Sequence, residues 1–356
     1  MSDVVRAALA TVVDGGALTE EQAYAAMGAI MDGEATASQL AALLVALRMR
    51  GETVDELTGF ALVMRERVLR VTAPPGAIDV VGTGGDRSGT FNISTSAALV
   101  VAASGIPVAK HGNRAITSRS GSADVLDALG VRIDHDADSA AEALASDGFA
   151  FLFAPGFHPA MKHAGPTRRE IGIRTAFNLI GPLTNPAGVD RLVVGVGDAS
   201  AAPRLAEVLH RLGTETAFVI HGAGIDELPL DGSGIVHEVD PTGVTERRVD
   251  PAAFGLATVP TAELGGGTPA ENATIVERVL GGETGPRRDV VVLNAAAGFM
   301  AAGVAASFET GIARAAATID SGAATTLLER LRASRHRHEA ELAAAAATST
   351  AEGATA

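Results

Sequence analysis

The stretch at residues 79–95, DVVGTGGDRSGTFNIST, decides the fold of this chain. A mostly apolar run from Ile78 to Val81 stops at a glycine-rich segment, and an apolar run from Ala97 to Ala103 follows it. This order predicts a strand, a tight turn and a helix. Glycines let the backbone approach a ligand without a Cβ in the way, and the free N–H groups at a helix start favour an anion. The stretch therefore predicts a phosphate or pyrophosphate site in an α/β fold.

One acid within this stretch narrows the prediction. Asp86 would repel a bare anion, so we expect a metal ion or a sugar hydroxyl to take part as well. No lysine follows the glycines as in a P-loop, and the third glycine of a dinucleotide fingerprint is missing. A glycine-rich turn without any ligand is the alternative for this stretch alone.

Composition bounds the class of protein. The 356 residues are 47% hydrophobic and 20% charged, which predicts a globular protein of two or three domains. No uninterrupted apolar run is long enough to span a membrane, and the N-terminus lacks a basic segment before an apolar block, so we expect no signal peptide. The chain has no cysteine, which excludes disulfides and thiolate metal sites. A cytoplasmic location is the expectation.

The net charge of −14 argues against two classes of partner, nucleic acid and anionic membranes, because both require a basic surface. Aromatic residues make up 3% of the chain and tryptophan is absent, so platforms for stacking bases are not expected either. Any phosphate site must therefore be a local feature of this acidic protein.

Residues 1–72 are predicted to form a small all-helical domain, a packing or dimerisation module. Capping patterns at Ser2, Thr19, Thr36 and Thr53 predict four helix starts, and no strand pattern lies between them. A Pro- and Gly-containing linker at residues 71–76 separates this domain from the rest.

After the linker, strands alternate with helices, which predicts a mostly parallel sheet flanked by helices on both faces. The expected strands are 78–81, 108–110, 149–153, 191–196, 217–220, 235–239 and 290–293, and the expected helices are 96–104, 122–129, 139–146, 201–212, 270–280 and 295–302. Residues 73–156 and 191–335 form the predicted large domain. Residues 157–190 look like a helical excursion that rejoins the N-terminal helices, and residues 336–356 like a helix end followed by a disordered tail.

A second polar cluster follows the next predicted strand. Lys110 and Arg114 supply local positive charge, and a glycine turn with several hydroxyls leads into another helix at Ser122. Because ligands bind at the carboxyl ends of parallel strands, two such loops can hold one extended phosphorylated ligand. The alternative is an ordinary solvated loop.

Two further clusters complete the candidate site. Asp226 and Glu227 follow glycines at the end of the strand 217–220, and paired carboxylates there suit Mg²⁺. A basic group around the excursion includes Arg168 and Arg174, and arginine can receive a substrate carboxylate through two parallel hydrogen bonds. A surface acidic turn and an ordinary charged helix are the alternatives. His158 and His163 lack the spacing of a helical zinc pair.

As a set, these motifs resemble the anthranilate phosphoribosyltransferase family. The resemblance rests on GTGGD at 82–86, KHGNR at 110–114, SGS at 120–122, Arg168 before EIGIRT at 170–175, GPLTNP at 181–186, and Asp226-Glu227. It runs from about Thr19 to about Leu331. It implies transfer of the phosphoribosyl group from phosphoribosyl pyrophosphate to the amine of anthranilate, with Mg²⁺, in tryptophan biosynthesis, by a homodimer joined through its helical domain.

The resemblance also implies roles for individual residues. Contacts with phosphoribosyl pyrophosphate would come from Gly82, Gly85, Asp86, Thr90, Asn92, Ile93, Ser94, Thr95, Lys110, His111, Gly112, Asn113, Arg114, Ala115, Ile116, Thr117, Ser118 and Ser122. Anthranilate would contact Gly82, Asn113 and Arg168, and the metal would involve Ser94, Asp226 and Glu227. No residue is expected to act as a strong general acid or base, because an aromatic amine is already a neutral nucleophile.

Two other functions are weighed against this one. A pyrimidine nucleoside phosphorylase would share the glycine loop and the Lys-His pair, but Asn113 and the Asp226-Glu227 pair argue against it. A non-catalytic paralogue that binds nucleic acid would share the fold, but the net charge of −14 and the complete set of loop residues oppose it.

Overall fold

The computed structural model describes residues 1–86, 88–115, 119–222 and 224–353, with side chains as far as residue 346. The N-terminal part consists of helices α1 (Asp3–Val13), α2 (Glu20–Met31), α3 (Ala37–Arg50) and α4 (Val54–Arg67). The predicted capping side chains start all of them: Ser2 caps α1, and capping boxes open the other three. Their apolar faces pack together, and Leu47, Leu57 and Phe60 are buried between them.

The second part is built on strands whose order explains where the loops meet. The main sheet has the order β1 (Asp79–Gly82), β4 (Arg191–Gly195), β5 (Thr216–His221), β6 (Gly234–Asp240) and β7 (Gly243–Val249). The pairs β1–β4 and β4–β5 are parallel, whereas β6 and β7 pair antiparallel at one edge. A second parallel pair, β2 (Val108–Gly112) and β3 (Phe149–Phe153), lies beside β1 through the bridge between Ile78 and Val108.

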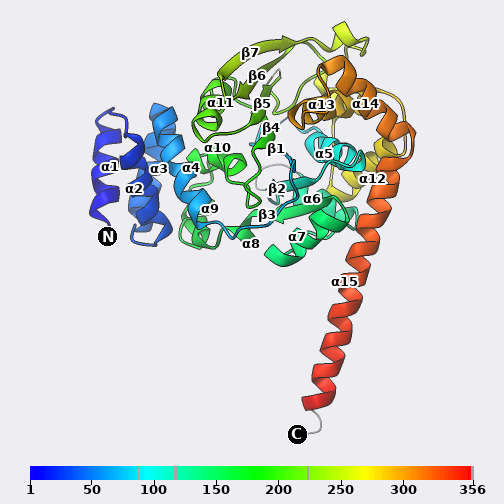
Figure 1. Cartoon of the computed structure of the whole chain (residues 1–356). Helices are drawn as coiled ribbons and strands as arrows, with labels where there is room; N and C mark the ends of the chain where they lie inside the picture. The colour runs from blue at the N-terminus through cyan, green and yellow to red at the C-terminus, as the bar shows by residue number, and fades with distance from the viewer. Residues whose placement is uncertain (87, 116–118, 223, 354–356) are drawn as a thin grey trace.

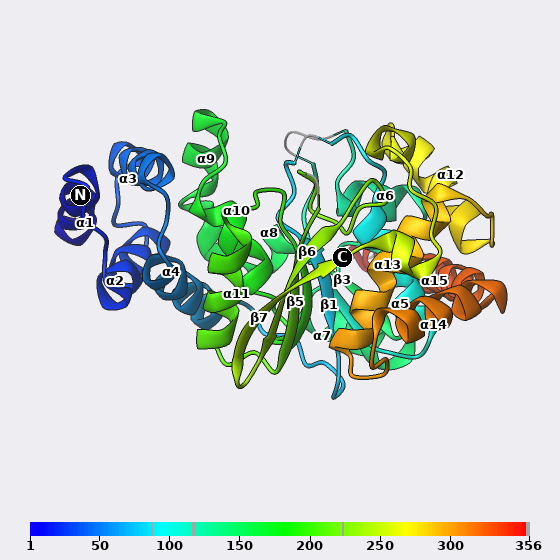
Figure 2. The same ribbon diagram turned by 90° about the horizontal axis from the view of Figure 1, so that it is seen from above.

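Helices cover both faces of this sheet, as the alternating pattern predicts. Figure 2 shows α11 (Ala202–Arg211) on one face, with α5 (Ile93–Ala103) and α13 (Pro286–Ala301) on the other. The remaining helices are α6 (Ser122–Ala128), α7 (Ala137–Ser146), α8 (Ala154–Phe157), α9 (Gly165–Ile171), α10 (Ala176–Ile180), α12 (Pro269–Leu280), α14 (Phe308–Asp320) and α15 (Ala323–Gly353). Short 3-10 turns lie at Pro159–Lys162, Gly181–Leu183, Pro251–Phe254 and Thr261–Leu264. The α/β fold class is confirmed, with an antiparallel edge added to the parallel centre.

The strand predicted at residues 290–293 is wrong, because this segment is the middle of α13. Val290, Val291 and Leu293 are fully buried, and α13 packs against α5, α14 and the sheet. A helix that is buried all round shows a continuous apolar run, which periodicity alone cannot distinguish from a buried strand. Pro286 in the first turn marks the true helix start.

The segment 157–190 lies against the N-terminal helices. Helix α9 packs on α3, and α10 packs on α3 and α4 (Figure 2). The Arg65 Nε donates a hydrogen bond to the Leu183 carbonyl at 2.7 Å. At the opposite end of the chain, α15 extends away from the body as one long helix (Figure 1). Within the described ranges, no helix is both long and apolar enough to cross a membrane.

Candidate active site

The carboxyl ends of β1, β4 and β5 bring together loops that are far apart in sequence. The N–H of Thr83, just after β1, donates to the Gly195 carbonyl at the end of β4, at 2.8 Å. The loop after β5 carries Asp226 and folds over both of these ends. This edge of a parallel sheet is where ligands of α/β proteins bind.

Asp226 joins the β5 loop to the glycine loop. Its Oδ2 accepts a hydrogen bond from the Gly84 N–H at 2.8 Å. A Cβ placed on Gly82 would lie 2.4 Å from the same Oδ2, and one on Gly195 would lie 1.7 Å from the Asp226 carbonyl. Glycine is therefore required at both positions because the backbone and the carboxylate approach each other so closely.

Glu227 joins the same loop to the start of α5. Its Oε1 accepts from the Ser94 N–H at 3.0 Å, in the first turn of that helix. The predicted metal set Ser94, Asp226 and Glu227 is thus brought to one place. Asp86 lies beside it, since its Oδ2 accepts from the Asp226 N–H at 3.4 Å.

The acids at this place carry more charge than the nearby protein groups neutralise. Burial, and then the charge of Asp86, raise the pKa of Asp226 to about 6. Burial and the charge of Asp226 raise the pKa of Glu227 well above its usual value. Lys110 lies close enough to oppose both effects, but burial lowers its own pKa. A cation at this site would relieve the repulsion between the carboxylates.

The donor set fits Mg²⁺ in a particular way. In the part of the chain that the structure describes, no three His, Cys, Asp or Glu side chains form a ready-made metal cage. Asp226 Oδ2 and Glu227 Oε1 accept the hydrogen bonds above, so a metal would use the second carboxylate oxygen of each residue, with Asp86 beside Asp226. Magnesium in proteins is commonly held by one or two carboxylates, with water and phosphate oxygens completing the octahedron. The site therefore fits magnesium that arrives with a phosphorylated ligand.

Beneath the two loops, a buried polar network fixes β2 to β1. Lys110 is fully buried, and its Nζ donates to the Val80 carbonyl. Asp79 accepts from the His111 N–H at 3.2 Å and from the Asn185 Nδ2 at 2.8 Å. Burial, opposed by the charge of Lys110 and by these hydrogen bonds, raises the pKa of Asp79 to about 7. Lys110 thus lies below the site, where its positive charge interacts with the carboxylates of Asp79, Asp226 and Glu227.

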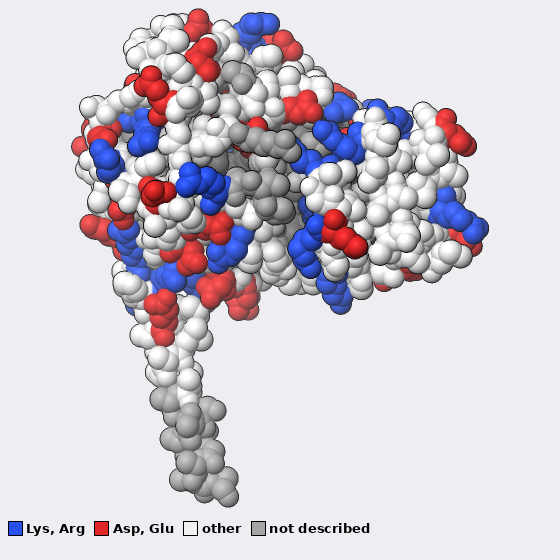
Figure 3. Space-filling model, turned by 180° about the vertical axis from the view of Figure 1, so that it is seen from behind, with Lys and Arg blue, Asp and Glu red and all other residues white. Residues whose placement is uncertain are grey.

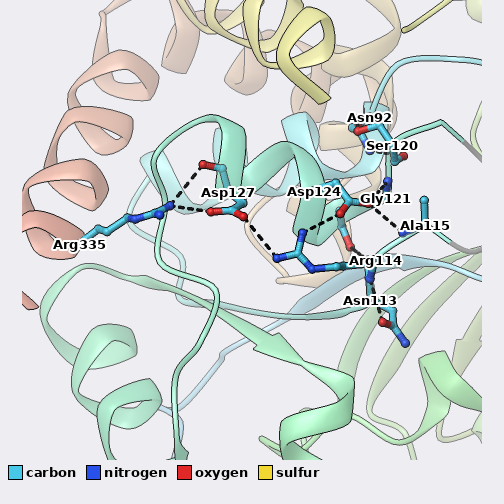
Figure 4. Close-up of polar contacts among 10 residues, drawn as sticks. Asn92, Asn113, Arg114, Ala115, Ser120, Gly121, Asp124, Asp127 and Arg335 are labelled. Carbon is cyan, nitrogen blue, oxygen red and sulfur yellow. Dashed lines mark hydrogen bonds and ion pairs between the residues drawn. The ribbon is translucent and has the colours of Figure 1, made fainter. Parts of the chain in front are cut away.

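The loop after β2 is the second predicted ligand loop, and Figure 4 shows its polar contacts. The Asn113 Oδ1 accepts from the Arg114 N–H at 2.8 Å, and Ser122 Oγ donates to the Asn113 carbonyl at 3.3 Å. The guanidinium of Arg114, one of the implied donor contacts, pairs with Asp124 at 2.8 Å and Asp127 at 3.3 Å. The predicted positions Ile116, Thr117 and Ser118 lie outside the described residues.

Asn92 connects the two ligand loops. Its Nδ2 donates to the Ser120 carbonyl at 3.2 Å, while its Oδ1 accepts from Ser120 Oγ at 3.2 Å and from Asn272 at 2.9 Å. The structure also places Ser88 and Thr90 together, with their hydroxyls 3.0 Å apart. Ile93 and Thr95 are buried in the first turn of α5.

Arg168, on α9, is a partly buried cation without an acidic partner among the described residues. Its guanidinium carbon lies 4.7 Å from the centre of the Phe177 ring, and burial lowers its pKa to about 10. The buried imidazoles of His111 and His158 lie side by side, 5.2 Å between ring centres, each with an Nε2 that has no partner in the described structure. The Arg168 guanidinium is thus a cation that can receive a carboxylate.

Figure 3 shows the surface hollowed between the helical part and the α/β part, with Lys and Arg side chains on both sides of the hollow. Arg174, predicted as part of a basic group that could receive a carboxylate, contacts the glycine loop. Its guanidinium donates to the Gly85 carbonyl and to Thr83 Oγ1, both at 3.3 Å. It therefore supports the glycine loop, which the sequence pattern did not indicate.

Sequence reasoning missed the supporting residues Asp79, Asn185 and Asp124. An acid inside an apolar strand was the only available signal for Asp79, since an isolated buried carboxylate requires partners. Asn185 lies in the GPLTNP block at 181–186, which contributed to the family resemblance but gave no role for Asn185 itself. The partners of both residues come from distant segments, so spacing along the chain could not reveal them.

Comparison with known families accounts for nearly the whole chain. Residues 6–68 match the helical bundle domain of the glycosyl transferase family, and residues 74–325 match its a/b domain. Anthranilate phosphoribosyltransferase from Pelotomaculum thermopropionicum is 53% identical over 92% of this chain and 96% of that protein. The enzyme of the same name from Symbiobacterium thermophilum is 50% identical over 95% of this chain and 100% of its own length.

Solved structures give the same picture. Anthranilate phosphoribosyltransferase from Thermus thermophilus superimposes with a TM-score of 0.87 at 47% identity, covering 92% of this chain and 99% of that one. The enzyme from Saccharomyces cerevisiae in complex with PRPP and Mg matches with a TM-score of 0.86 at 27% identity, covering 95% and 99%. The yeast enzyme in complex with 4-fluoroanthranilate matches with a TM-score of 0.80 at 26% identity, covering 92% and 99%.

Proposed function

Since this chain belongs to the glycosyl transferase family and aligns almost end to end with anthranilate phosphoribosyltransferases, we propose that it catalyses the reaction of those relatives. It transfers the 5-phosphoribosyl group from phosphoribosyl pyrophosphate to the amine of anthranilate. The products are N-(5-phosphoribosyl)anthranilate and pyrophosphate, in tryptophan biosynthesis. The observation that carries the proposal is the convergence of Gly84, Ser94, Asp226 and Glu227 at one sheet edge.

The reaction breaks the bond between C1 of the ribose and the pyrophosphate oxygen, forms a bond between C1 and the amine nitrogen, and releases one proton from that nitrogen to the pyrophosphate or to water. Negative charge develops on the leaving pyrophosphate, and positive charge on the sugar ring. The N–H groups of the glycine loop and of the first turn of α5 that are not bonded to Gly195, Asp226 or Glu227 would provide donors for the leaving group. Magnesium, when bound at Asp226 and Glu227, supplies positive charge at the pyrophosphate oxygens.

The acceptor needs positioning more than activation, because an aromatic amine is neutral and nucleophilic at neutral pH. Arg168 provides the cation for its carboxylate, and its partly buried setting strengthens that ion pair. Asn113 and Gly82 would lie between acceptor and donor. Catalysis then comes from orientation, electrostatics and exclusion of water from the reactive sugar.

We further propose that residues 1–72 and 157–190 act as one helical unit against the large domain formed by 73–156 and 191–335. The packing of α9 and α10 on α3 and α4 supports this division. The hollow between the two units would then hold the acceptor. Arg168, in the segment 157–190, would bind the carboxylate of that acceptor.

The protein is proposed to be a homodimer joined through its helical domain. Apolar side chains remain exposed there: Val13 is 66% and Met49 83% exposed, on α1 and α3. Exposed apolar groups on one element pair are typical of an interface. Light scattering should give twice the mass of the chain, and Met49→Glu should shift it towards the monomer. We place the protein in the cytoplasm, where a charged sugar pyrophosphate is retained.

The function is tested by the products that purified protein makes. With Mg²⁺, phosphoribosyl pyrophosphate and anthranilate, mass spectrometry should detect phosphoribosyl-anthranilate and an equal amount of pyrophosphate. The same preparation with inorganic phosphate and thymidine or uridine should release no free base. Phosphorolysis of a nucleoside without transfer to anthranilate would assign the phosphorylase activity instead.

A further inference from the structure

Asp124, at the start of α6, ties together the two ends of the loop that follows β2. Its Oδ2 accepts a hydrogen bond from the Ala115 N–H at 2.9 Å and another from the Gly121 N–H at 3.0 Å (Figure 4). One carboxylate oxygen therefore bonds to the chain where it leaves Asn113 and again where it enters the helix. Hydrogen bonds to an ionised acceptor are stronger than those between neutral groups.

The geometry at this point leaves no room for other arrangements. A Cβ on Gly121 would lie 2.4 Å from the Ala115 nitrogen and 2.9 Å from the Asn113 carbonyl oxygen. A Cβ on Gly112 would lie 2.4 Å from Ser122 Oγ. The outgoing and returning segments thus touch each other directly; the Ser122 hydroxyl joins them at Asn113, and the Asp124 carboxylate joins them at Ala115 and Gly121.

A row of charges supports Asp124 from outside. The Arg114 guanidinium bridges Asp124 Oδ1 and Asp127 Oδ2, and Arg335 of α15 binds Asp127 Oδ1 at 2.9 Å (Figure 4). The Asp124 side chain is only 16% exposed, against 48% for Arg114 and 37% for Asp127. Exposed ion pairs contribute little, so the partly shielded carboxylate with its two backbone bonds dominates this row.

We propose that Asp124 is a positioning residue for the phosphoribosyl donor, which it serves by holding Asn113, Ala115 and Ser122 in their binding arrangement. This inference rests on the proposed function, since it assigns these neighbours to the donor site. Asp124 itself is assigned no ligand contact, because its Oδ2 accepts from the loop backbone and its Oδ1 pairs with Arg114. A site that must first be ordered binds its ligand more weakly, in proportion to the fraction of ordered molecules.

The test is a kinetic comparison of Asp124→Asn and Asp124→Ala with the unaltered protein. Loss of the carboxylate should raise KM for phosphoribosyl pyrophosphate by about 10- to 100-fold, more for Ala than for Asn, because Asn keeps an acceptor oxygen. KM for anthranilate should rise clearly less than KM for the donor, because only Asn113 of the three residues that Asp124 holds is also assigned to the acceptor, and kcat should change by less than about 3-fold.

Asp127→Asn is the matched variant, since it lies on the same helix and contacts the same arginine but holds no backbone N–H of the loop. Its donor KM should rise by less than about 3-fold. Should Asp124→Ala fail to fold, Asp124→Asn decides, with donor affinity measured by calorimetry in the presence of Mg²⁺ below its melting temperature.

Equal increases in both KM values, or a fall in kcat at unchanged donor KM, would overturn the assignment. A KM for phosphoribosyl pyrophosphate that rises as much in Asp127→Asn as in Asp124→Asn would also overturn the assignment. An active unaltered protein whose Asp124 variants bind the donor normally contradicts this inference alone. An unaltered protein that binds the donor but transfers nothing to anthranilate contradicts the proposed function instead.

Discussion

The Gly84 N–H donates to Asp226 Oδ2 at 2.8 Å, a contact between residues 142 positions apart in the chain. It joins the glycine loop after β1 to the acidic loop after β5. Together with the bond from Ser94 N–H to Glu227, it makes three separate segments one site. Backbone N–H groups of the loops hold the carboxylates. The positions of the carboxylates therefore depend on the loop conformations, and the loop conformations depend on the carboxylates.

Gly82→Ala should remove transferase activity by at least about 100-fold, because the new Cβ would lie 2.4 Å from Asp226 Oδ2 and displace it. Steady-state kinetics at saturating Mg²⁺ measures this. Gly156→Ala is the control, since a Cβ there meets nothing within 4 Å. Comparable losses in the two variants would mean that general destabilisation, and not the displaced carboxylate, is responsible.

Arg168→Ala should raise KM for anthranilate by about 10- to 100-fold, the range expected for losing a charge-assisted carboxylate contact. Arg168→Lys should recover only part of it, because lysine lacks the paired donors. The neighbouring exposed Arg169→Ala serves as the control. If the donor KM rose as much as the acceptor KM, the role of Arg168 as the carboxylate receptor would be refuted.

Asp226→Asn combined with Glu227→Gln should raise the Mg²⁺ concentration for half-maximal rate by at least about 10-fold, because both charged metal ligands are lost. A magnesium titration at fixed substrates measures it. Asp231→Asn, in the same connection between β5 and β6, is the control. An unchanged titration of the double variant would remove both residues from the metal site.

The pH dependence of stability should report the half-buried His135. Its Nδ1 has no partner within the described structure, and burial, with a smaller contribution from Arg132, lowers its pKa to about 4. The folded protein then binds fewer protons than the unfolded chain, so stability is present above the unfolded pKa of 6.5 and is lost as pH falls towards 4.

Between about pH 7 and pH 5.5, this histidine should remove about 1 kcal/mol of unfolding free energy. His135→Leu should lack that part of the loss in urea titrations at the two pH values. The exposed His336→Leu should behave like the unaltered protein. An acid loss in His135→Leu as large as in the unaltered protein would show that His135 titrates normally.

The elements that sequence predicted well are those whose signals are local. Each capping box, at Thr19, Thr36 and Thr53, involves only four consecutive residues, and all three are present in the structure. Strand 149–153 is a short aromatic and aliphatic run, and the structure gives the same bounds. Each of these depends on hydrogen bonds or burial that neighbouring residues provide themselves.

The elements that sequence missed depend on tertiary surroundings. The run at 290–293 was predicted as a strand because α13, to which it belongs, is buried on every side and therefore shows no helical periodicity. Strand β7 was not predicted because four consecutive residues of it are exposed. The glycine loop was found from its composition, whereas its support by Arg174 comes from a segment 89 residues away. The direction of the Arg114 side chain, too, followed from Asp124 and Asp127 and not from its own motif.

The central claim is that the joined loops transfer phosphoribosyl to anthranilate with magnesium, and anthranilate fluorescence tests it most directly. Purified protein should abolish the fluorescence only when phosphoribosyl pyrophosphate and Mg²⁺ are both present, and the Asp226→Asn, Glu227→Gln double variant should do so far more slowly at the same magnesium concentration. Fluorescence that stays constant with both present, for protein shown to be folded, would contradict the account.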